Sequence, residues 1–212
     1  MVVSRLALFP LGTVLVPTAV LPLHVFEPRY RQLMADLGGP GGSPEGAELG
    51  IVLITRGSEV GGGESREAVG TCARVAEATR LADGRWLIAV VGEARFEVTT
   101  WLPDDPYPLA EVRSLEEPPW DGDPGLLADT ERRVRRCLAL VAESGGSAAP
   151  VTFGLDAEPR RATWQLSAVA PVSVVDRQQL LETASHRCRL VRVAQMVDEV
   201  SEILALRLGE AE

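Results

Sequence analysis

The side chains that most often perform catalysis are few in this chain and lie far apart. Two histidines and three cysteines are present, and every one of the 21 basic residues is an arginine. The absence of lysine from these 212 residues excludes a P-loop lysine, a Schiff-base lysine and a serine–lysine peptidase dyad. The sequence therefore offers no lysine-dependent chemistry.

The two histidines do not complete a catalytic pair. His186 and Cys188 are two positions apart, and on one helix their side chains would point about 200° apart. His24 lies in an alternating apolar run, which favours a structural role. Neither histidine has a recognisable nucleophile or oxyanion site near it in sequence. We predict no catalytic residue and keep an enzyme of unrecognised chemistry as an alternative.

Metal and cofactor sites are not indicated either. Cys72, Cys137 and Cys188 lack the close spacing of zinc ligands, and buried reduced thiols are expected. The 30 acidic residues show no spacing typical of a metal or glycosidase site. The glycine runs do not match the GxGxxG pattern of dinucleotide sites. We therefore predict no metal and no cofactor.

A binding function suits residues 9–34, FPLGTVLVPTAVLPLHVFEPRYRQLM, better than catalysis. Short apolar runs broken by prolines precede a helix that Pro28 can begin. The spacing of its apolar residues predicts one buried face, made of Tyr30, Leu33, Met34 and Leu37. We expect this segment to border an apolar groove that takes extended or unfolded peptide. The predicted binding residues are Val16, Pro17, Val20, Phe26, Arg29 and Tyr30.

Three of these residues also have a purely structural interpretation. Phe26 would pack in the core, Tyr30 would join the helix to a sheet, and Arg29 would brace Glu27 or another carboxylate. Amphipathic stripes usually face a core. The structural and binding interpretations do not exclude each other, and both stay open at this point.

Residues 1–118 are predicted to form a β-rich subdomain. Several short β-branched runs lie between Gly and Pro residues, and Asp83-Gly84 supplies the turn of a clear hairpin. Closely spaced strands of this kind suggest a small barrel or a strongly bent sheet. The glycine-rich segments 38–48 and 57–67 have no periodicity, and we expect them to be mobile surface loops.

Residues 119–212 are predicted to form a helical subdomain. Asp123 and Pro124 can begin one helix, shorter helices are expected at 159–169 and in DRQQLLET, and 144–150 breaks the chain. A last helix over 185–208 has apolar residues at spacings of three and four. We favour an intramolecular packing seam over a coiled coil there, because fewer than about three to four heptads are present.

Net charge restricts the classes of partner. The formal charge of −9 opposes broad binding to nucleic acid or anionic membranes. No run approaches the about 18 apolar residues of a membrane span, and the N-terminus lacks the features of a signal peptide. We expect a cytoplasmic protein, and its oligomeric state is left open.

The opening block LALFPLGTVLVPTAVLPLHVFEPRYRQLM resembles the Lon-type substrate-binding domain, the N-terminal recognition module of ATP-dependent Lon proteases. Further matches follow in the order that this family shows. They are Val69-Gly70-Thr71, Ala73-Arg74-Val75, Gly92-Glu93-Ala94-Arg95-Phe96 and VSVVDRQQLLET before a long final helix. The resemblance covers essentially the whole chain, and only the glycine-rich loops and SGGSAAP depart from it.

The resemblance implies an α+β fold, a PUA-like β-barrel followed by a C-terminal helical bundle. It also implies a non-catalytic module that binds unfolded or apolar-rich peptides or a protein partner, without the ATPase and peptidase parts of a Lon protease. Because fold-level analogy does not identify a ligand, an RNA-binding PUA-like module stays as an alternative, although the negative net charge disfavours it.

Overall fold

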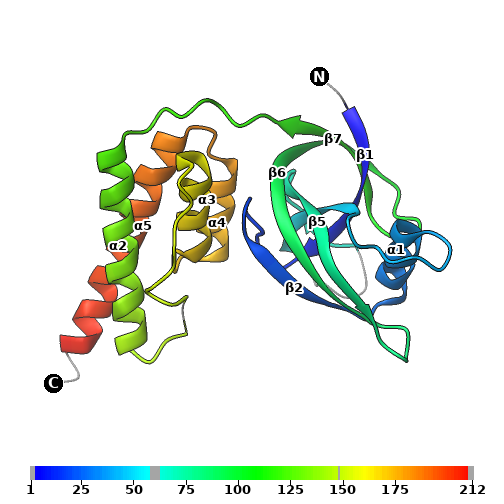
Figure 1. The fold of residues 1–212 in the computed structure, drawn as a ribbon, viewed down its shortest axis with the longest axis horizontal. Helices are drawn as coiled ribbons and strands as arrows, with labels where there is room; N and C mark the ends of the chain where they lie inside the picture. Colours follow the sequence, from blue (N-terminus) through cyan, green and yellow to red (C-terminus); the bar gives the residue numbers. More distant parts are fainter. Residues whose placement is uncertain (1–2, 58–62, 148, 210–212) are drawn as a thin grey trace. The chain divides into compact units, whose positions relative to one another are not determined.

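The computed structural model describes residues 3–57, 63–147 and 149–209. The chain is α+β and consists of two compact units, Met1–Glu116 and Glu117–Glu212. Among these residues, the first unit contains the sheet and one helix, and the second contains four helices (Figure 1). The division falls two residues before the predicted boundary between 118 and 119.

The first unit is a closed, mostly antiparallel sheet. Its strands follow the order β1-β7-β6-β5-β3-β4, and β1 also pairs with β3, which closes the barrel. Strand β2 lies off this path and pairs with β6. The strands are β1 (Val3–Leu11), β2 (Val20–Val25), β3 (Glu48–Arg56), β4 (Ser65–Arg66), β5 (Val69–Arg80), β6 (Trp86–Leu102) and β7 (Leu109–Leu115).

Strand β1 changes partners along its length. Residues 3–7 pair antiparallel with β7, whereas residues 8–11 pair parallel with β3. The predicted hairpin is also present: β5 and β6 are joined through Asp83 and Gly84, and Gly84 has the positive φ of +82° that glycine adopts readily. These two features set the shape of the barrel.

Helix α1 (Pro28–Gly38) covers part of the barrel core. Tyr30, Leu33 and Met34 are buried, and Leu37 packs partly against the same cluster, which confirms the predicted apolar face. Pro28 occupies the first turn, and Gly39, with φ of +67°, follows the last helical residue. The helix is thus held to the sheet by the stripe that the sequence predicts.

Parts of the two glycine-rich loops are more ordered than expected. In the first, Gly46 N donates to Val75 O (2.8 Å), and Pro44 is buried. In the second, β4 pairs with β3, and Glu67 N donates to Leu53 O (2.9 Å). Main-chain pairing does not need apolar side chains, so parts of these segments are paired although their sequence shows no periodicity. The predicted mobility of the two loops stays a prediction. Residues 58–62 lie outside the described residues.

The second unit consists of helices α2 (Pro124–Glu143), α3 (Pro159–Val169), α4 (Val174–Glu182) and α5 (His186–Gly209). Buried residues of α5 pack against Val134 and Leu138 of α2. The last helix therefore forms the intramolecular seam that we expected. Within the described residues, no helix is long and apolar enough to cross a membrane.

Arginine side chains close several helix ends in this unit. Arg177 donates to Ala168 O (2.6 Å) and Ala170 O (3.0 Å) at the end of α3. Arg189 donates to Leu180 O (3.2 Å) and to Thr183 O at the end of α4. Ala170 O also accepts from Val172 N (2.9 Å) and Leu180 O from Thr183 N (3.3 Å), so the guanidinium groups add further donors to carbonyls at the helix ends.

One arginine of α2 departs from the solvated side that the spacing of Arg132, Arg133, Arg135 and Arg136 predicts for this helix. Arg135 is half-buried, donates to Phe153 O (2.9 Å) and to Val151 O, and pairs with Glu131 (2.6 Å). A guanidinium can bind several acceptors at once, and here it ties the connection after α2 to the helix.

The buried face of α1 gives a first prediction. Leu33→Asp should prevent folding or lower the free energy of unfolding by at least ~3 kcal/mol, because an unpaired carboxylate would enter the core. Ala35→Gln on the exposed face of the same helix should change it by less than about 0.5 kcal/mol. Urea unfolding of both variants measures this. Equal, small effects would show that α1 does not pack as described.

The start of α5 gives a prediction that depends on pH. Asp121 accepts hydrogen bonds from the Ser185 hydroxyl and from Arg187 N (3.0 Å), and these bonds, Ser185 first, lower the pKa of its carboxyl. Asp121→Ala should therefore lower stability by about 1 kcal/mol at pH 7, a typical value for a helix cap.

A carboxyl with a lowered folded-state pKa stabilises the fold above its unfolded pKa and loses that effect as pH falls through the folded one. The difference in the free energy of unfolding between Asp121→Ala and the wild type should thus shrink below about pH 4. Glu143→Ala, at an exposed position at the end of α2, is the control. A difference that stays constant down to pH 2.5 would contradict the capping role of the ionised carboxylate.

Candidate functional site

A groove with a volume of about 160 Å³ lies in the barrel unit between the end of β1, β2 and the start of α1. Its walls are mostly apolar, with one imidazole and one carboxylate. The lining residues are Phe9, Pro10, Leu11, Pro22, Leu23, His24, Phe26, Glu27 and Tyr30. Apolar walls with a few polar groups are typical of binding sites.

A strained turn leads the chain into β2. Thr18 has φ of +70°, which is unusual for a β-branched residue. Its amide donates to Gly92 O (2.8 Å), and Gly92 N donates to Ala19 O (2.9 Å). A Cβ atom at Gly92 would come within 2.5 Å of Val16 O, so only glycine allows this close approach. The turn thus fixes where β2 begins.

Strand β2 forms one wall of the groove and has one paired edge. It pairs with β6, and its other edge has no strand partner among the described residues. Pro22 and Pro10, which both line the groove, lack an N–H group. Prolines of this kind hinder the addition of another strand. The groove is therefore better suited to holding side chains than to extending the sheet.

Tyr30 connects α1 to the floor of the groove. Its ring stacks on Phe9 at a centroid distance of 4.0 Å, and the Arg29 guanidinium lies 4.5 Å from the ring centroid. Arg29 also pairs with Glu27 (3.2 Å). These contacts match the structural roles expected for Tyr30 and Arg29. Burial raises the pKa of the Tyr30 hydroxyl well above its usual value, so Tyr30 contributes here as an aromatic wall.

Phe26 and Val20 are exposed. Phe26 is 49% exposed and lies 5.8 Å from the His24 ring, so the expectation that it packs in the core was wrong. It follows the end of β2, where the chain leaves the sheet before α1 begins. Val20 is 63% exposed at the start of β2. Both residues therefore present apolar surface to solvent.

Val16 and Pro17 are buried, and they correct the predicted binding set. Val16 is only 1% exposed, and neither residue can contact a ligand at the surface. The segment is held inside the unit, where Thr71 donates to Leu15 O (2.6 Å). Pro10 and Leu23 line the groove but were not among the predicted binding residues, although both lie within residues 9–34.

The other histidine and the cysteines lie in different surroundings. His186 is buried, with its Nε2 atom 3.1 Å from Pro118 O and its Nδ1 atom facing Arg189, whereas Cys188 is exposed, contrary to expectation. Burial raises the pKa of the Cys72 thiol to about 11, which keeps it protonated at neutral pH. Within the described part of the chain, no group of three or more His, Cys, Asp or Glu could hold a metal ion.

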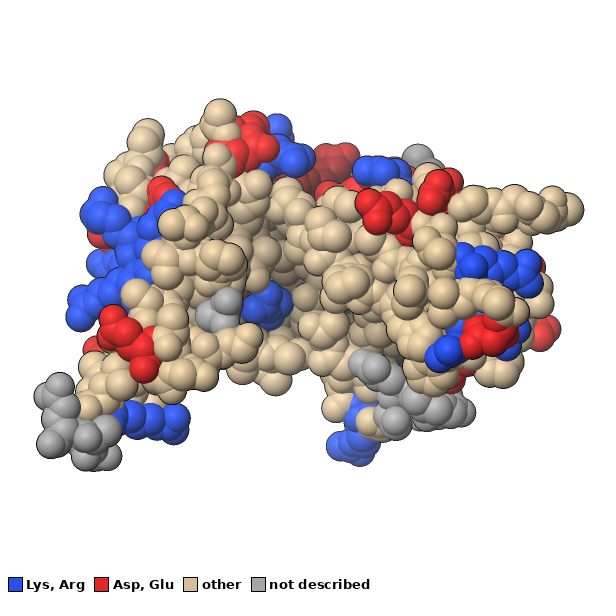
Figure 2. Space-filling view, turned by 60° about the horizontal axis from the view of Figure 1, so that its bottom comes forward, with Lys and Arg blue, Asp and Glu red and all other residues tan. Residues whose placement is uncertain are grey.

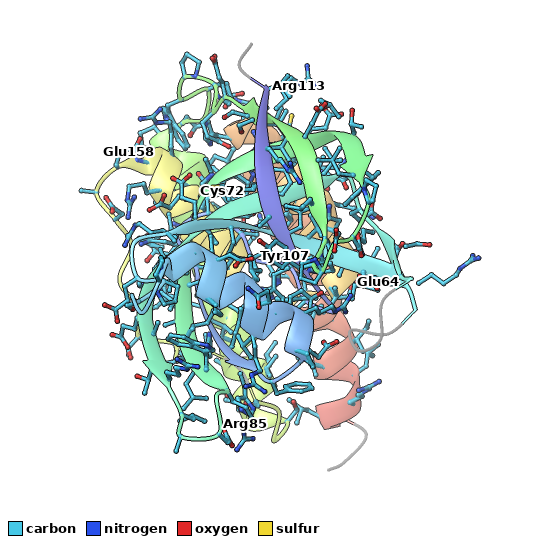
Figure 3. The ribbon with its side chains drawn as sticks, turned by 90° about the vertical axis from the view of Figure 1, so that its right-hand side faces the viewer. Glu64, Cys72, Arg85, Tyr107, Arg113 and Glu158 are labelled. Carbon is cyan, nitrogen blue, oxygen red and sulfur yellow. The ribbon has the colours of Figure 1, made fainter. Side chains whose placement is uncertain are left out.

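Helix α1 is also fixed at its far end. The Tyr107 hydroxyl, labelled beside α1 in Figure 3, donates to Asp36 Oδ2 (2.8 Å). Burial and this contact raise the pKa of Tyr107 to about 12, so the hydroxyl keeps its proton at neutral pH. The helix that forms one side of the groove is therefore held at both ends, and the groove is largely pre-formed.

Comparison with known families gives one match that covers most of the chain. The family described as the ATP-dependent protease La (LON) substrate-binding domain matches residues 5–199. Among full-length relatives, the chain is 26% identical over 206 residues to the Lon protease of Anaeromyxobacter dehalogenans and 29% identical over 215 residues to Lon protease 2 of Herpetosiphon aurantiacus. Each alignment covers 95% of this chain and 24% of the relative, so the chain spans about a quarter of those proteins.

Two solved structures share the fold. The Lon N-terminal domain protein from Xanthomonas campestris aligns with a TM-score of 0.65 and 26% identity, over 90% of this chain and 96% of that one. The N-terminal domain of the Mycobacterium avium complex Lon protease aligns with a TM-score of 0.58 and 17% identity, over 92% and 98%. The second likeness supports the fold alone.

The stack beneath the groove gives a testable difference between two variants. The Tyr30 hydroxyl is buried and has no hydrogen-bond partner among the described residues. Tyr30→Phe should therefore leave the free energy of unfolding within about 1 kcal/mol of the wild type or raise it. Tyr30→Ala should lower it by about 3–5 kcal/mol, because the stack on Phe9 is lost and a cavity remains. Urea unfolding compares the two, and a large loss in Tyr30→Phe would reveal a hydroxyl partner and contradict this account.

Proposed function

Because the chain belongs to the family of the ATP-dependent protease La (LON) substrate-binding domain, we propose that it is a non-catalytic module that recognises extended, apolar segments of polypeptides. The groove between β1, β2 and α1 is the proposed binding site. The relatives are whole Lon proteases, of which this chain corresponds to about a quarter. Recognition, rather than hydrolysis, is what these 212 residues are proposed to contribute.

The observation that carries the proposal is the exposed Phe26 beside an apolar groove. Phe26 lines the groove while 49% of its surface stays accessible to solvent. Val20 and Leu87 extend the apolar surface along β2 and β6, where Leu87 is paired with His24 and is 48% exposed. Exposed aromatic and aliphatic anchors next to a pocket are the usual source of affinity in peptide recognition.

The charges of the molecule favour peptide over RNA. Many arginines are already paired with carboxylates, such as Arg74 with Glu93 (2.6 Å) and Arg133 with Asp129 (2.7 Å). Blue and red side chains lie next to one another at several places on the face drawn in Figure 2. A phosphate backbone needs unpaired cations along a continuous track. RNA binding stays the second candidate, since the relation to PUA-like folds suggested it.

The absence of catalytic groups supports a binding role. The sequence has no GxxxxGK[ST] motif and no lysine, so the proposal assigns to these residues neither ATP hydrolysis nor peptide cleavage by a Lon-type dyad. A protein or peptide partner is proposed without a cofactor. The cytoplasmic location expected from the sequence remains part of the proposal.

A matched pair of variants tests the groove. Val20 and Val175 are 63% and 64% exposed, one beside the groove and one on α4. Val20→Asp should weaken the binding of apolar-rich peptides from micromolar affinity by at least about fivefold, because it places a charge among the anchors. Val175→Asp should have no effect on binding. Both should shift stability by less than about 0.5 kcal/mol.

Fluorescence polarisation with labelled ten-residue peptides measures the peptide affinities of the two variants. A parallel titration of the wild type with single-stranded RNA at 50 and 500 mM salt tests RNA binding, the second candidate. Peptide binding should persist at high salt, whereas RNA binding would fall steeply. The proposal fails if the wild type binds no peptide, or if Val175→Asp weakens binding and Val20→Asp does not.

A further inference from the structure

A second cleft, larger and more polar, lies on the other side of the start of α1. Its volume is about 400 Å³, and α1, the glycine-rich segment after it and the β5–β6 hairpin contribute to its walls. Figure 3 labels Arg85 in the turn of that hairpin, below α1 in the view. The lining residues are Pro28, Arg31, Gln32, Ala35, Gly39, Gly41, Gly42, Arg80, Gly84 and Trp86.

The charge of this cleft is opposite to that of the molecule. Its lining contains two arginines and no Asp or Glu, in a chain with a formal charge of −9. Among the described residues, neither Arg31 nor Arg80 takes part in an ion pair, whereas the neighbouring Arg85 pairs with Asp83 (2.7 Å). Two like charges in one cleft repel each other unless an anion joins them.

Each arginine lies against another residue of the cleft. A Cβ atom at Gly84 would overlap the Arg31 guanidinium, so the glycine of the hairpin turn gives Arg31 its space. The Arg80 guanidinium lies 5.8 Å from the centre of the Trp86 ring, a distance that allows a cation–π contact.

The cleft and the groove are neighbours along the same elements. Phe26 and Glu27 line the groove, and Pro28, the next residue, lines the cleft. A polypeptide that leaves the groove past the start of α1 therefore reaches the two arginines.

We propose that the Arg31–Arg80 cleft binds a carboxylate carried by the polypeptide whose apolar segment occupies the groove. This inference rests on the proposed function and adds a substrate class to it: apolar segments with an Asp or Glu next to them. Guanidinium groups bind carboxylates with directed, charge-assisted hydrogen bonds. Trp86 and Ala35 offer apolar contact to the aliphatic part of the acidic side chain.

Two peptides that differ only in charge test the proposal. Both carry the same apolar core, and one ends in two glutamates where the other has two glutamines. The wild type should bind the acidic peptide at least about fivefold more tightly at 50 mM salt, as expected for charge-assisted bonds. Arg31→Gln and Arg80→Gln should each reduce this ratio, and the double variant should abolish it without changing the affinity for the glutamine peptide.

Arg5→Gln is the matched control. Arg5 is exposed on β1, has no ion pair among the described residues and does not line the cleft. The Arg5→Gln substitution removes the same charge from the barrel unit. The ratio of the affinities for the glutamate and glutamine peptides should stay at the wild-type value. A loss of the ratio in Arg5→Gln would mean that general charge, rather than the cleft, attracts the peptide, and would overturn the proposal.

The remaining outcomes separate this inference from the proposed function. Equal binding of the two peptides by the wild type would overturn the proposed role of the cleft and leave the proposed binding site in the groove intact. If the wild type binds neither peptide, both the proposed function of the groove and the proposed role of the cleft are wrong. If free glutarate protects Arg31 and Arg80 from modification by phenylglyoxal while the peptides bind equally, the cleft takes small dicarboxylates, and its assignment to polypeptides is wrong.

Discussion

The change of partner within β1 is the constraint on which the barrel and its groove depend. Residues 3–7 pair with β7 and residues 8–11 with β3. One strand therefore closes the sheet, and its last residues have a strand partner on one side only within the described chain. Phe9, Pro10 and Leu11 become the groove wall for this reason. Phe9 also stacks on Tyr30, so the same strand positions α1, and with it the start of the second cleft.

Arginine performs every cationic role in this protein, and its geometry explains much of the helical unit. A guanidinium carries five donors in a fixed plane and can bind two carbonyls at once. Arg177 and Arg189 do this at the ends of α3 and α4. A lysine ammonium, a compact charge, would not match two neighbouring carbonyls equally well. Arg31 and Arg80, which form no ion pair among the described residues, differ from this pattern, and this difference is the basis of the proposed carboxylate site.

Periodic segments could be predicted from the sequence, and irregular ones could not. The face of α1, the β5–β6 hairpin and the seam of α5 follow from spacing and turn chemistry. The segment from the end of β1 to the start of β2 has apolar residues without a period, so nothing in it distinguishes the buried Val16 from the exposed Val20, the first residue of β2. Which of its residues are buried is decided by tertiary contacts, such as the hydrogen bond from the Thr71 hydroxyl to Leu15 O.

The Arg31–Arg80 cleft was not predictable for a similar reason. Its two arginines come from different elements, and their meeting depends on how the hairpin turn lies against α1. The family resemblance gave the fold and the type of function, but not which surface binds. Phe26, one of the predicted binding residues, lines the groove, and its exposure follows from the end of β2 rather than from any periodic pattern.

The central claim is that extended apolar polypeptide binds in the groove between β1, β2 and α1. Amide chemical-shift mapping of the ¹⁵N-labelled protein during titration with an apolar-rich peptide tests it most directly. The account predicts that the largest shifts fall on Phe9, Leu11 and residues 21–27, with the amides of α2 to α5 unchanged. Shifts concentrated on the helical unit, with the groove amides unmoved at saturation, would contradict it.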